Sequence, residues 1–419
     1  LEYIEKYKTS LEKSFKKTLG KASIKRGEII SQSYDYCKYA IFNHSLADLI
    51  LKKNYPRNIS LRKRNAFRVA FGLLKNGYSI RDTIYAAGGL LDRYLKDLLR
   101  KYRNIKVDDI IDKTDRTTFL SIKYSYPKII VEKLVKLLGV DEAEKIIRKD
   151  SNPVEWIRVN TLKIDVDKAI KKLEKEEVVV EKDDDFPELY KVIKSKKPLS
   201  SLRIVKDFKI VIHDKGSIAV VHALNPREEE IIIDAAAAPG MKTSLIAQLT
   251  NNRSFIIAVD ISRNRIYEMR NVLEKMGVRN VEIILGDSSK LYWRSGEKIL
   301  IDAPCSNSGA IGRDPALRLI LKDERNVLKH VDIQWKILSN FIARSPINLK
   351  YIVYSVCSYL PEEGEEIVKK AVEKYRVRLV KPNILGIDGY RKYIFKNYVK
   401  RLFPHINSST GFFIACIEK

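Results

Sequence analysis

Two of the four cysteines, Cys305 and Cys357, each follow an apolar run that predicts a buried β-strand, KILIDA in the first case and LKYIVYSV in the second. The carboxyl ends of parallel strands meet at one edge of a sheet, so we expect both thiols at that edge. A single cysteine is usually a small buried hydrophobe, which is our interpretation of Cys37 and Cys416. Two thiols that converge on one cleft instead predict nucleophilic chemistry.

Three further predicted strands are followed by acidic residues, Asp234, Asp260 and Asp287. An acid after the second strand can accept both hydroxyls of a ribose, and one after the third can accept an adenine amine. The loop after the first strand, DAAAAPGMKT, has one glycine, Gly240, whereas a nicotinamide dinucleotide usually needs G-x-G-x-x-G to seat its pyrophosphate. S-adenosyl-L-methionine has no phosphate, so the pattern predicts this cofactor.

A thiol beside a methyl donor suits one reaction in particular. Carbon 5 of a pyrimidine is too weak a nucleophile to attack a sulfonium methyl group. Addition of a thiolate at carbon 6 gives an enamine-like adduct whose carbon 5 can attack. Asp302, three residues before Cys305, is positioned to stabilise that adduct at the ring nitrogen N3. The second thiol can then assist release of the product. No His or third Cys lies at ligand spacing, so we expect no metal.

The elements that must position these residues follow an α/β pattern over residues 226–419. Near-continuous apolar runs are typical of parallel strands that are buried on both faces, so we predict a Rossmann-like, doubly wound sheet. The six expected strands are IIIDAAA, SFIIAVDIS, VEIILGDSS, KILIDAPCS, LKYIVYSVCS and GFFIACIEK.

Two smaller domains are expected before this sheet. Residues 146–225 alternate strand, helix and strand, with a helix opened by Asp165 and a loop around Pro187 and Pro198, which predicts a small α+β domain. Residues 1–145 have apolar side chains at helical spacing and predict an all-helical domain. The pair Gly88 and Gly89 interrupts one such run and predicts two helices there.

The charge balance favours a nucleic acid as partner. Lys and Arg outnumber Asp and Glu by 79 to 53, a formal net charge of +26. The alternative, a thermophile surface of ion-pair networks, would need balanced signs. Tyr55 and Phe67 lie in a basic stretch that has no acid, so they are candidates for stacking on bases; the alternative is a solvated helical face with both rings in the core. The basic residues of this stretch are Lys52, Lys53, Arg57, Arg62, Lys63, Arg64, Arg68, Lys75 and Arg81.

The chain has no apolar stretch of the roughly 18 residues that a membrane span requires. Its first twenty residues lack the apolar block of a signal peptide. The four cysteines have no C-x-x-C spacing and are too few for a disulfide framework. These features predict a reduced, cytoplasmic protein without a membrane partner.

The motifs together resemble the Sun/Nop family of RNA cytosine-5 methyltransferases, which includes bacterial 16S rRNA methyltransferase B. The resemblance covers roughly residues 150–419, and its double-cysteine signature is specific. The matching segments, in the family's order, are RVNTLK at 158–163, HDKGS at 213–217, DAAAAPGMKT at 234–243, GDSS at 286–289, DAPCSNSGAIGRDP at 302–315, YSVCS at 354–358, and RLFPH and GFFIA within 401–415.

The resemblance implies a role for each matching position. Cys357 would be the nucleophile, Cys305 would assist product release, and Asp302 and Lys242 would lie near the target base. The middle domain would be RNA-recognition-like, and the helical domain would be a NusB-like RNA-binding domain, notably over residues 123–139. The residues implied to contact S-adenosyl-L-methionine are Ala236, Ala237, Ala238, Pro239, Gly240, Met241, Lys242, Asp260, Arg265, Asp287 and Asp302.

The chain departs from the family pattern without losing a catalytic group. Val356 replaces the usual Thr before the nucleophile and removes a hydroxyl near the base, and Thr410 replaces the Asp before the final GFF. Ala236 and Met241 replace a usual Cys and Gly of the cofactor loop, and Ala316 replaces an acid.

The sequence therefore predicts a three-domain RNA 5-methylcytosine methyltransferase, with rRNA favoured over tRNA by the NusB-like resemblance. The first 225 residues are expected to supply most of the RNA recognition. Two alternatives stay open: the same chemistry on tRNA, and a weakly active RNA-binding ribosome assembly factor. Val356 and the basic N-terminal region motivate the second alternative.

Overall fold

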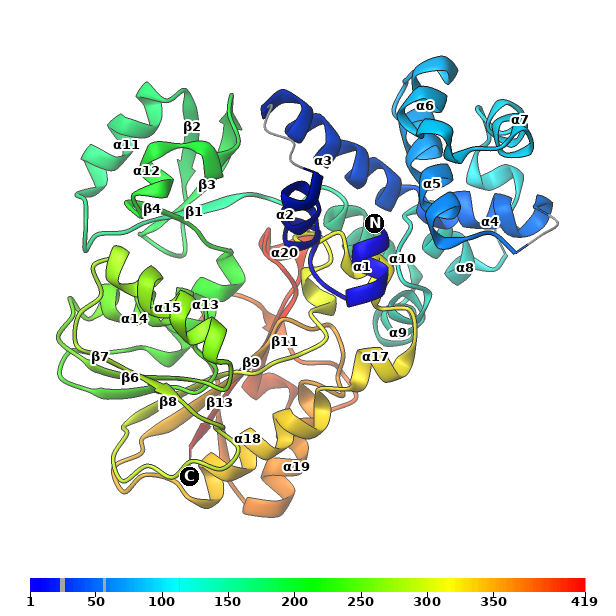
Figure 1. The fold of residues 1–419 in the computed structure, drawn as a ribbon. Helices are drawn as coiled ribbons and strands as arrows, with labels where there is room; N and C mark the ends of the chain where they lie inside the picture. The colour runs from blue at the N-terminus through cyan, green and yellow to red at the C-terminus, as the bar shows by residue number, and fades with distance from the viewer. Residues whose placement is uncertain (23–26, 56–57, 113, 419) are drawn as a thin grey trace. The chain divides into compact units, whose positions relative to one another are not determined.

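The computed structural model describes residues 1–22, 27–55, 58–112 and 114–418 (Figure 1). The chain divides into two compact units, one of Leu1–Asn152 with Ala310–Val327 and one of Pro153–Gly309 with Leu328–Lys419. The sequence-based boundaries near residues 145 and 225 stay predictions. No helix of the described ranges is long and apolar enough to cross a membrane.

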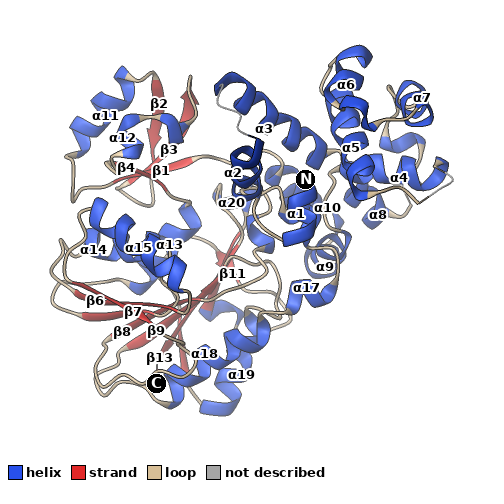
Figure 2. Cartoon of the chain, viewed as in Figure 1, coloured by secondary structure: helices blue, strands red, loops and turns tan. Residues whose placement is uncertain are grey.

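The first unit is built from helices, as predicted (Figure 2). Its largest core cluster includes Phe67 and Phe71 together with Leu95 and Leu99. The predicted interruption at the glycine pair is confirmed, because a 3-10 turn over Gly88–Leu90 separates two helices. The helices of this unit are α1 (Glu2–Tyr7), α2 (Leu11–Ala22), α3 (Gly27–Phe42), α4 (His44–Asn54), α5 (Leu61–Lys75), α6 (Ile80–Ala86), α7 (Arg93–Lys101), α8 (Arg116–Lys123), α9 (Lys128–Leu138), α10 (Val140–Asp150) and α16 (Leu317–Ile320), with α17 (Glu324–Leu328) at its end.

A short segment from the second half of the sequence, Ala310–Val327, belongs to this helical unit. Leu319 and Ile320 of α16 are buried in one cluster with Ile4 and Leu11. The backbone N–H of Leu11 also donates to the Asp314 carboxylate at 3.0 Å. The helical core is therefore completed by residues that follow the Cys305 motif in sequence.

Arg318 anchors this segment inside the helical unit. Its side chain is only 1% exposed, and its guanidinium lies 4.6 Å from the ring centroid of Phe42 and 5.1 Å from that of Tyr126. It also donates a 2.6 Å hydrogen bond to the carbonyl of Tyr124. Burial lowers the pKa of Arg318, yet aromatic rings on two sides and a carbonyl acceptor stabilise the cation.

The second unit begins with a small antiparallel sheet in the order β2-β3-β1-β4, flanked by a helix that starts after Asp165 as predicted. One prediction was wrong: β3 lies where we expected a loop around Pro187 and Pro198. The two prolines bound the segment but do not enter it, and pairing with both β1 and β2 makes it a strand. The elements are β1 (Trp156–Val159), β2 (Val178–Lys182), β3 (Leu189–Ser195), β4 (Ile210–Ile212), α11 (Val166–Lys175) and α12 (Arg203–Lys206).

A nine-stranded sheet forms the rest of this unit, in the order β11-β12-β13-β9-β8-β5-β6-β7 with β10 against β13. The six predicted strands are all present, and the five that run from β5 to β9 are parallel. The predicted α/β fold is therefore confirmed. The strands are β5 (Ile231–Asp234), β6 (Phe255–Asp260), β7 (Val281–Leu285), β8 (Lys298–Asp302), β9 (Tyr351–Val356), β10 (Arg378–Val380), β11 (Ile387–Asp388), β12 (Val399–Leu402) and β13 (Phe412–Glu418).

Alternation along the strands explains how this sheet is buried on both faces (Figure 2). Along β8, Leu300 faces a cluster that contains Leu245 of α14, whereas Ile299 and Ile301 face a cluster that contains Phe341 of α18. Helices thus cover both faces and leave the strand ends as the open edge. The covering helices are α13 (Lys215–Leu224), α14 (Met241–Leu249) and α15 (Arg263–Lys275) on one face and α18 (Val331–Ala343) and α19 (Glu365–Tyr375) on the other.

Candidate active site

Cys305 lies in the turn after β8 and Cys357 in the turn after β9, and we call these the two cysteine turns. They lie side by side because β8 and β9 are parallel neighbours, with Asp302 in register with Ser355. The Sγ atoms of Cys305 and Cys357 are 3.3 Å apart. The Cys357 thiol also donates to Oδ1 of Asn307 at 2.9 Å, a contact that the sequence analysis did not anticipate. The structure thus brings together the two thiols that the sequence placed at one sheet edge.

The two thiols have different surroundings. Cys305 is 5% exposed, whereas Cys357 is only half-buried. The hydrogen bond with Cys357, together with burial, raises the pKa of the Cys305 thiol well above its ordinary value. Cys305 therefore stays protonated at neutral pH and can donate a hydrogen bond, while Cys357 is the thiol that a substrate can reach.

Lys242 and Asp302 form an ion pair beside these turns. Nζ of Lys242 lies 2.6 Å from Oδ2 of Asp302 and 3.3 Å from Oγ of Ser217. The other Asp302 oxygen accepts a 2.9 Å hydrogen bond from Ser355. Burial lowers the pKa of the Lys242 ammonium, but the Asp302 carboxylate more than offsets it, and the pKa lies above its ordinary value. The sheet edge therefore carries an ammonium and a carboxylate, which can donate and accept a proton.

The loop between β5 and α14, residues 235–240, is held in place by Asp260 and Arg265. Oδ2 of Asp260 accepts from the backbone N–H of Ala238 at 3.3 Å, and Arg265 bridges this carboxylate and the Ala238 carbonyl. Gly240 has φ of 96° at the N-cap of α14, and a Cβ there would lie 2.9 Å from the Leu273 side chain. Only glycine fits this position without strain.

Asp287 lies just beyond the end of β7, next to the strand that carries Asp260. Its Oδ1 accepts from the backbone and hydroxyl of Ser289, and its Oδ2 lies 3.4 Å from Lys290. The hydroxyl bond with Ser289 is the main cause that lowers the pKa of this carboxyl. No group of three or more His, Cys, Asp or Glu side chains that could hold a metal occurs among residues 1–22, 27–55, 58–112 and 114–418.

Glu363 links the two cysteine turns and was not identified from the sequence. Its carboxylate is fully buried and accepts from Ser306, the residue after Cys305, through both the backbone (2.8 Å) and the hydroxyl (2.6 Å). The hydroxyl of Ser358, the residue after Cys357, donates to it at 2.6 Å. Burial raises the pKa of Glu363 despite these hydrogen bonds. One carboxylate therefore sets the spacing of both thiols.

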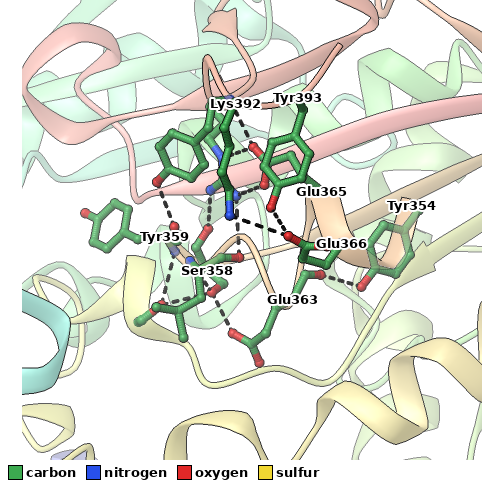
Figure 3. Close-up of polar contacts among 12 residues, drawn as sticks. Tyr354, Ser358, Tyr359, Glu363, Glu365, Glu366, Lys392 and Tyr393 are labelled. Atoms are coloured by element: carbon green, nitrogen blue, oxygen red, sulfur yellow. Dashed lines mark hydrogen bonds and ion pairs between the residues drawn. The ribbon is translucent and has the colours of Figure 1, made fainter. Parts of the chain in front are cut away.

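A second buried group, the ion pair of Arg401 and Glu365, supports the turn after Cys357; Glu365 and Ser358 are labelled in Figure 3. The guanidinium of Arg401 pairs with Glu365 at 2.5 Å and donates to the carbonyl of Ser358 at 2.8 Å. Tyr390 donates to the carbonyl of Tyr359 at 2.7 Å. These contacts explain why RLFPH lies in the motif set, since its first residue fixes the backbone after the nucleophile position.

The structure accounts for one departure from the family pattern. Thr410 donates through its hydroxyl (2.7 Å) and its backbone N–H to the Asp214 carboxylate. A carboxylate at position 410 would repel Asp214, so a hydroxyl suits this chain. Val356 is fully buried in the cluster that contains Phe413.

Asp234 gives a prediction about pH. Its carboxyl is buried at the end of β5, accepts a 2.7 Å hydrogen bond from Thr243, and burial raises its pKa from 3.8 to about 6. The folded state thus binds this proton more tightly than the unfolded chain. The resulting stability is present below pH 4 and is lost as the pH rises through 6, about 3 kcal/mol in all.

We therefore expect Asp234→Asn to remove this part of the pH dependence. Urea unfolding of both proteins from pH 4 to pH 7 should show the variant gaining stability relative to wild type as the pH rises. Parallel curves for the two proteins would contradict the assignment.

The basic stretch of the helical unit divides into buried and exposed parts. Arg68 is fully buried and pairs with Asp48 (2.5 Å) and Glu5 (2.6 Å). Phe67 is in the core, so the core interpretation is correct for that ring, whereas Tyr55 is partly buried against the core and donates to Asp92. Arg57 lies outside the described residues. The exposed cations are Lys52, Lys53, Arg62 and Arg81.

Comparison with known proteins agrees with this fold. Residues 221–418 match the family model for 16S rRNA methyltransferase RsmB/F, and residues 126–195 match the ferredoxin-like domain of RsmF/B-like methyltransferases. The crystal structure of the protein PH0851 superposes with a TM-score of 0.81 at 25% identity, covering 97% of this chain and 94% of that one.

Two curated relatives differ in the RNA that they modify. The tRNA (cytosine(72)-C(5))-methyltransferase of Pyrococcus horikoshii is 30% identical over 391 residues, which is 70% of this chain and 97% of the relative. The human 28S rRNA (cytosine(4447)-C(5))-methyltransferase is 30% identical over 320 residues, covering 72% of this chain. The chain spans only 38% of the length of the human relative.

The fold and the paired cysteines at its open edge define a Rossmann-like methyltransferase. The match to the ferredoxin-like domain of that family includes β1, β2 and β3 of the small antiparallel sheet before it. The chain belongs to the RsmB/F family of RNA cytosine-C5 methyltransferases.

Proposed function

We propose that this protein transfers a methyl group from S-adenosyl-L-methionine to carbon 5 of a cytosine in rRNA. The observation that carries the proposal is the pair of thiols 3.3 Å apart, next to the Lys242–Asp302 ion pair. The four cysteines are free thiols, as the reducing cytoplasm in which we expect the protein to act requires.

The residues at the strand ends fit the proposed cofactor. The carboxylate of Asp260 suits a ribose, and that of Asp287 suits an adenine amine. Asp302 and Lys242 suit the charged amino-acid end. S-adenosyl-L-methionine, when bound, supplies a methyl group activated on a sulfonium.

Cys357 acts as the nucleophile in this proposal. Its thiolate forms a bond to carbon 6 of the cytosine, and the electron pair moves to carbon 5, which then takes the methyl group. The Lys242–Asp302 pair holds a proton at N3 and stabilises the charge of the adduct. Solvent takes the proton of carbon 5, the freed electron pair re-forms the double bond between carbons 5 and 6, and Cys357 leaves as a thiolate that accepts a hydrogen bond from the protonated Cys305.

A second candidate is the same reaction on tRNA. The observation that favours it is the Pyrococcus horikoshii relative, which the chain matches along 97% of that protein's length. The weakly active assembly factor is the third candidate, and the complete set of thiol, acid and ammonium groups argues against it.

The test is methyl transfer from radiolabelled S-adenosyl-L-methionine to separate rRNA and tRNA pools, followed by nucleoside chromatography. We expect labelled 5-methylcytidine in the rRNA pool. Label in the tRNA pool alone would select the second candidate. RNA binding without transfer to either pool would support the assembly-factor candidate.

The helical unit is proposed to bind RNA through its exposed cations, Lys52, Lys53, Arg62 and Arg81. Neutralising all four should reduce the slope of log affinity against log salt by up to about 3, because each contact with single-stranded RNA contributes roughly 0.7. Filter binding from 50 to 300 mM salt measures the slope, and exchange of Lys for Arg and Arg for Lys is the charge-matched control. An unchanged slope would show that these cations do not contact RNA phosphates and instead lie on a solvated helical face.

A further inference from the structure

The segment between β11 and β12, residues 389–398 with the sequence GYRKYIFKNY, is here named the basic loop. It carries three basic residues, and no acid follows Asp388 until Glu418. The proposed function uses none of its side chains. Its inner and outer sides differ in what they contact.

The inner side is fixed to the turn that follows Cys357 (Figure 3). The Tyr390 hydroxyl donates to the carbonyl of Tyr359, two residues after the cysteine, and its backbone N–H donates to Glu365 at 3.2 Å. Tyr393 donates to Glu366, and Lys392 lies 3.4 Å from the same carboxylate. Both tyrosines are buried, so the loop is held rigidly beside the nucleophile turn.

The outer side presents cations and apolar surface to solvent. The Ile394 side chain is 102% exposed, and Tyr398 is 52% exposed. Arg391 is exposed as well, and among the residues that the structure describes neither Arg391 nor Lys396 has an acidic partner. The outer side thus combines cationic, aliphatic and aromatic groups on one exposed loop.

RNA fits this surface better than an apolar protein partner does. Unpaired cations attract phosphates, and a half-exposed tyrosine ring offers a face on which an unpaired base can stack. A target cytosine that reaches Cys357 must leave its stack, and an aliphatic side chain can fill the space that an extruded base leaves. All three chemistries occur on one loop that touches the nucleophile turn.

We propose that the basic loop binds the unpaired nucleotides that flank the target cytosine, an inference that rests on the proposed function. Arg391 and Lys396 contact phosphates, Tyr398 stacks on a base, and Ile394 wedges beside the extruded cytosine. RNA recognition is then shared by the catalytic sheet instead of coming mainly from the first 225 residues.

The test compares Arg391→Ala/Ile394→Ala/Tyr398→Ala with wild type in the full-length protein. The probe is a fluorescein-labelled oligocytidylate of twelve nucleotides, followed by fluorescence anisotropy. We expect binding at least about tenfold weaker, since stacking and phosphate contacts are lost together. On methylatable RNA, KM should rise by a similar factor while kcat changes less than about twofold, because no group of the reaction is removed.

A matched control replaces an exposed cation and an exposed isoleucine elsewhere on the same sheet unit. Arg344 and Ile347, which is 92% exposed, lie before the amino end of β9, the end opposite to Cys357. Arg344→Ala/Ile347→Ala should bind the probe as wild type does. Equal weakening in the control, or no weakening in the loop variant, would overturn the inference.

The two proposals can fail separately. Wild-type protein that binds the probe through the loop but produces no 5-methylcytidine would refute the proposed function and leave the loop as an RNA-binding surface. Wild-type protein that methylates RNA, with loop variants unchanged in affinity and KM, would refute only the loop.

Discussion

Cys357→Ala is expected to lower methyl transfer to RNA by at least about a thousandfold. Without the thiol no bond to carbon 6 can form, and carbon 5 stays too weak a nucleophile to take the methyl group. The half-buried side chain touches Asn307 and Cys305, so its removal should leave the fold intact. Single-turnover transfer from radiolabelled cofactor measures the loss, and circular dichroism checks the fold.

The other thiol gives the contrasting result. Cys305→Ala keeps the nucleophile but removes the protonated neighbour 3.3 Å away, so the adduct should form and leave slowly. A band of protein linked to RNA should persist in denaturing gels with Cys305→Ala and be absent with Cys357→Ala. A wild-type rate in Cys357→Ala would show that Cys357 is not the nucleophile. A protein–RNA adduct in that variant would instead make Cys305 the nucleophile and Cys357 the residue that assists release.

Glu363→Ala is expected to have the largest effect on stability, a loss of about 3 to 5 kcal/mol. The substitution leaves the buried donors Ser306, Ser358 and Gln334 without their shared acceptor. The two cysteine turns then lose the carboxylate to which both are hydrogen-bonded, so kcat should also fall in the fraction that remains folded. Urea unfolding at pH 7 gives the free energy, and single-turnover transfer in the native baseline gives kcat.

The control for this prediction is a nearby carboxylate in the first turn of α19 that is partly exposed. Glu366 contacts Lys392 and Tyr393, as Figure 3 shows. Glu366→Ala should cost less, about 1 to 2 kcal/mol, because only the Tyr393 hydroxyl and a partly exposed ion pair lose their partner. A similar loss of unfolding free energy in the two variants would mean that the buried hydrogen bonds of Glu363 do not stabilise the fold more than the contacts of Glu366 do. Full activity in folded Glu363→Ala would show that the turns keep their spacing without it.

The sheet and much of the site followed from local pattern. Apolar runs ending in acids or cysteines gave all six long strands, and parallel neighbours then brought Cys305 to Cys357 without any further assumption. Asp165 could be interpreted for the same reason, because a helix N-cap is a requirement of the local backbone.

What escaped prediction depends on contacts between distant segments. β3 is a strand because two neighbours pair with it, and short β12 carries Arg401 to a glutamate 36 residues away. Glu363 reads as one acid in the surface-like run PEEGEE, yet its carboxylate is buried under both turns. The buried Arg68 similarly could not be separated from its exposed basic neighbours. In a run of like charges, the charge and hydropathy of the residues cannot show which side chain is buried in the folded protein.

The segment 310–327 also bears on the order in which the chain can fold during synthesis. The helical unit is begun by residues 1–152, but Leu319 and Ile320 of its core emerge only after roughly 160 further residues, about 8 to 30 s later at ribosomal speed. Until then Ile4 and Leu11 lack part of their apolar cover, and Arg318 has not yet entered between its two rings. Residues 1–152 are thus synthesised before residues 310–327 but complete their core only after that segment has emerged.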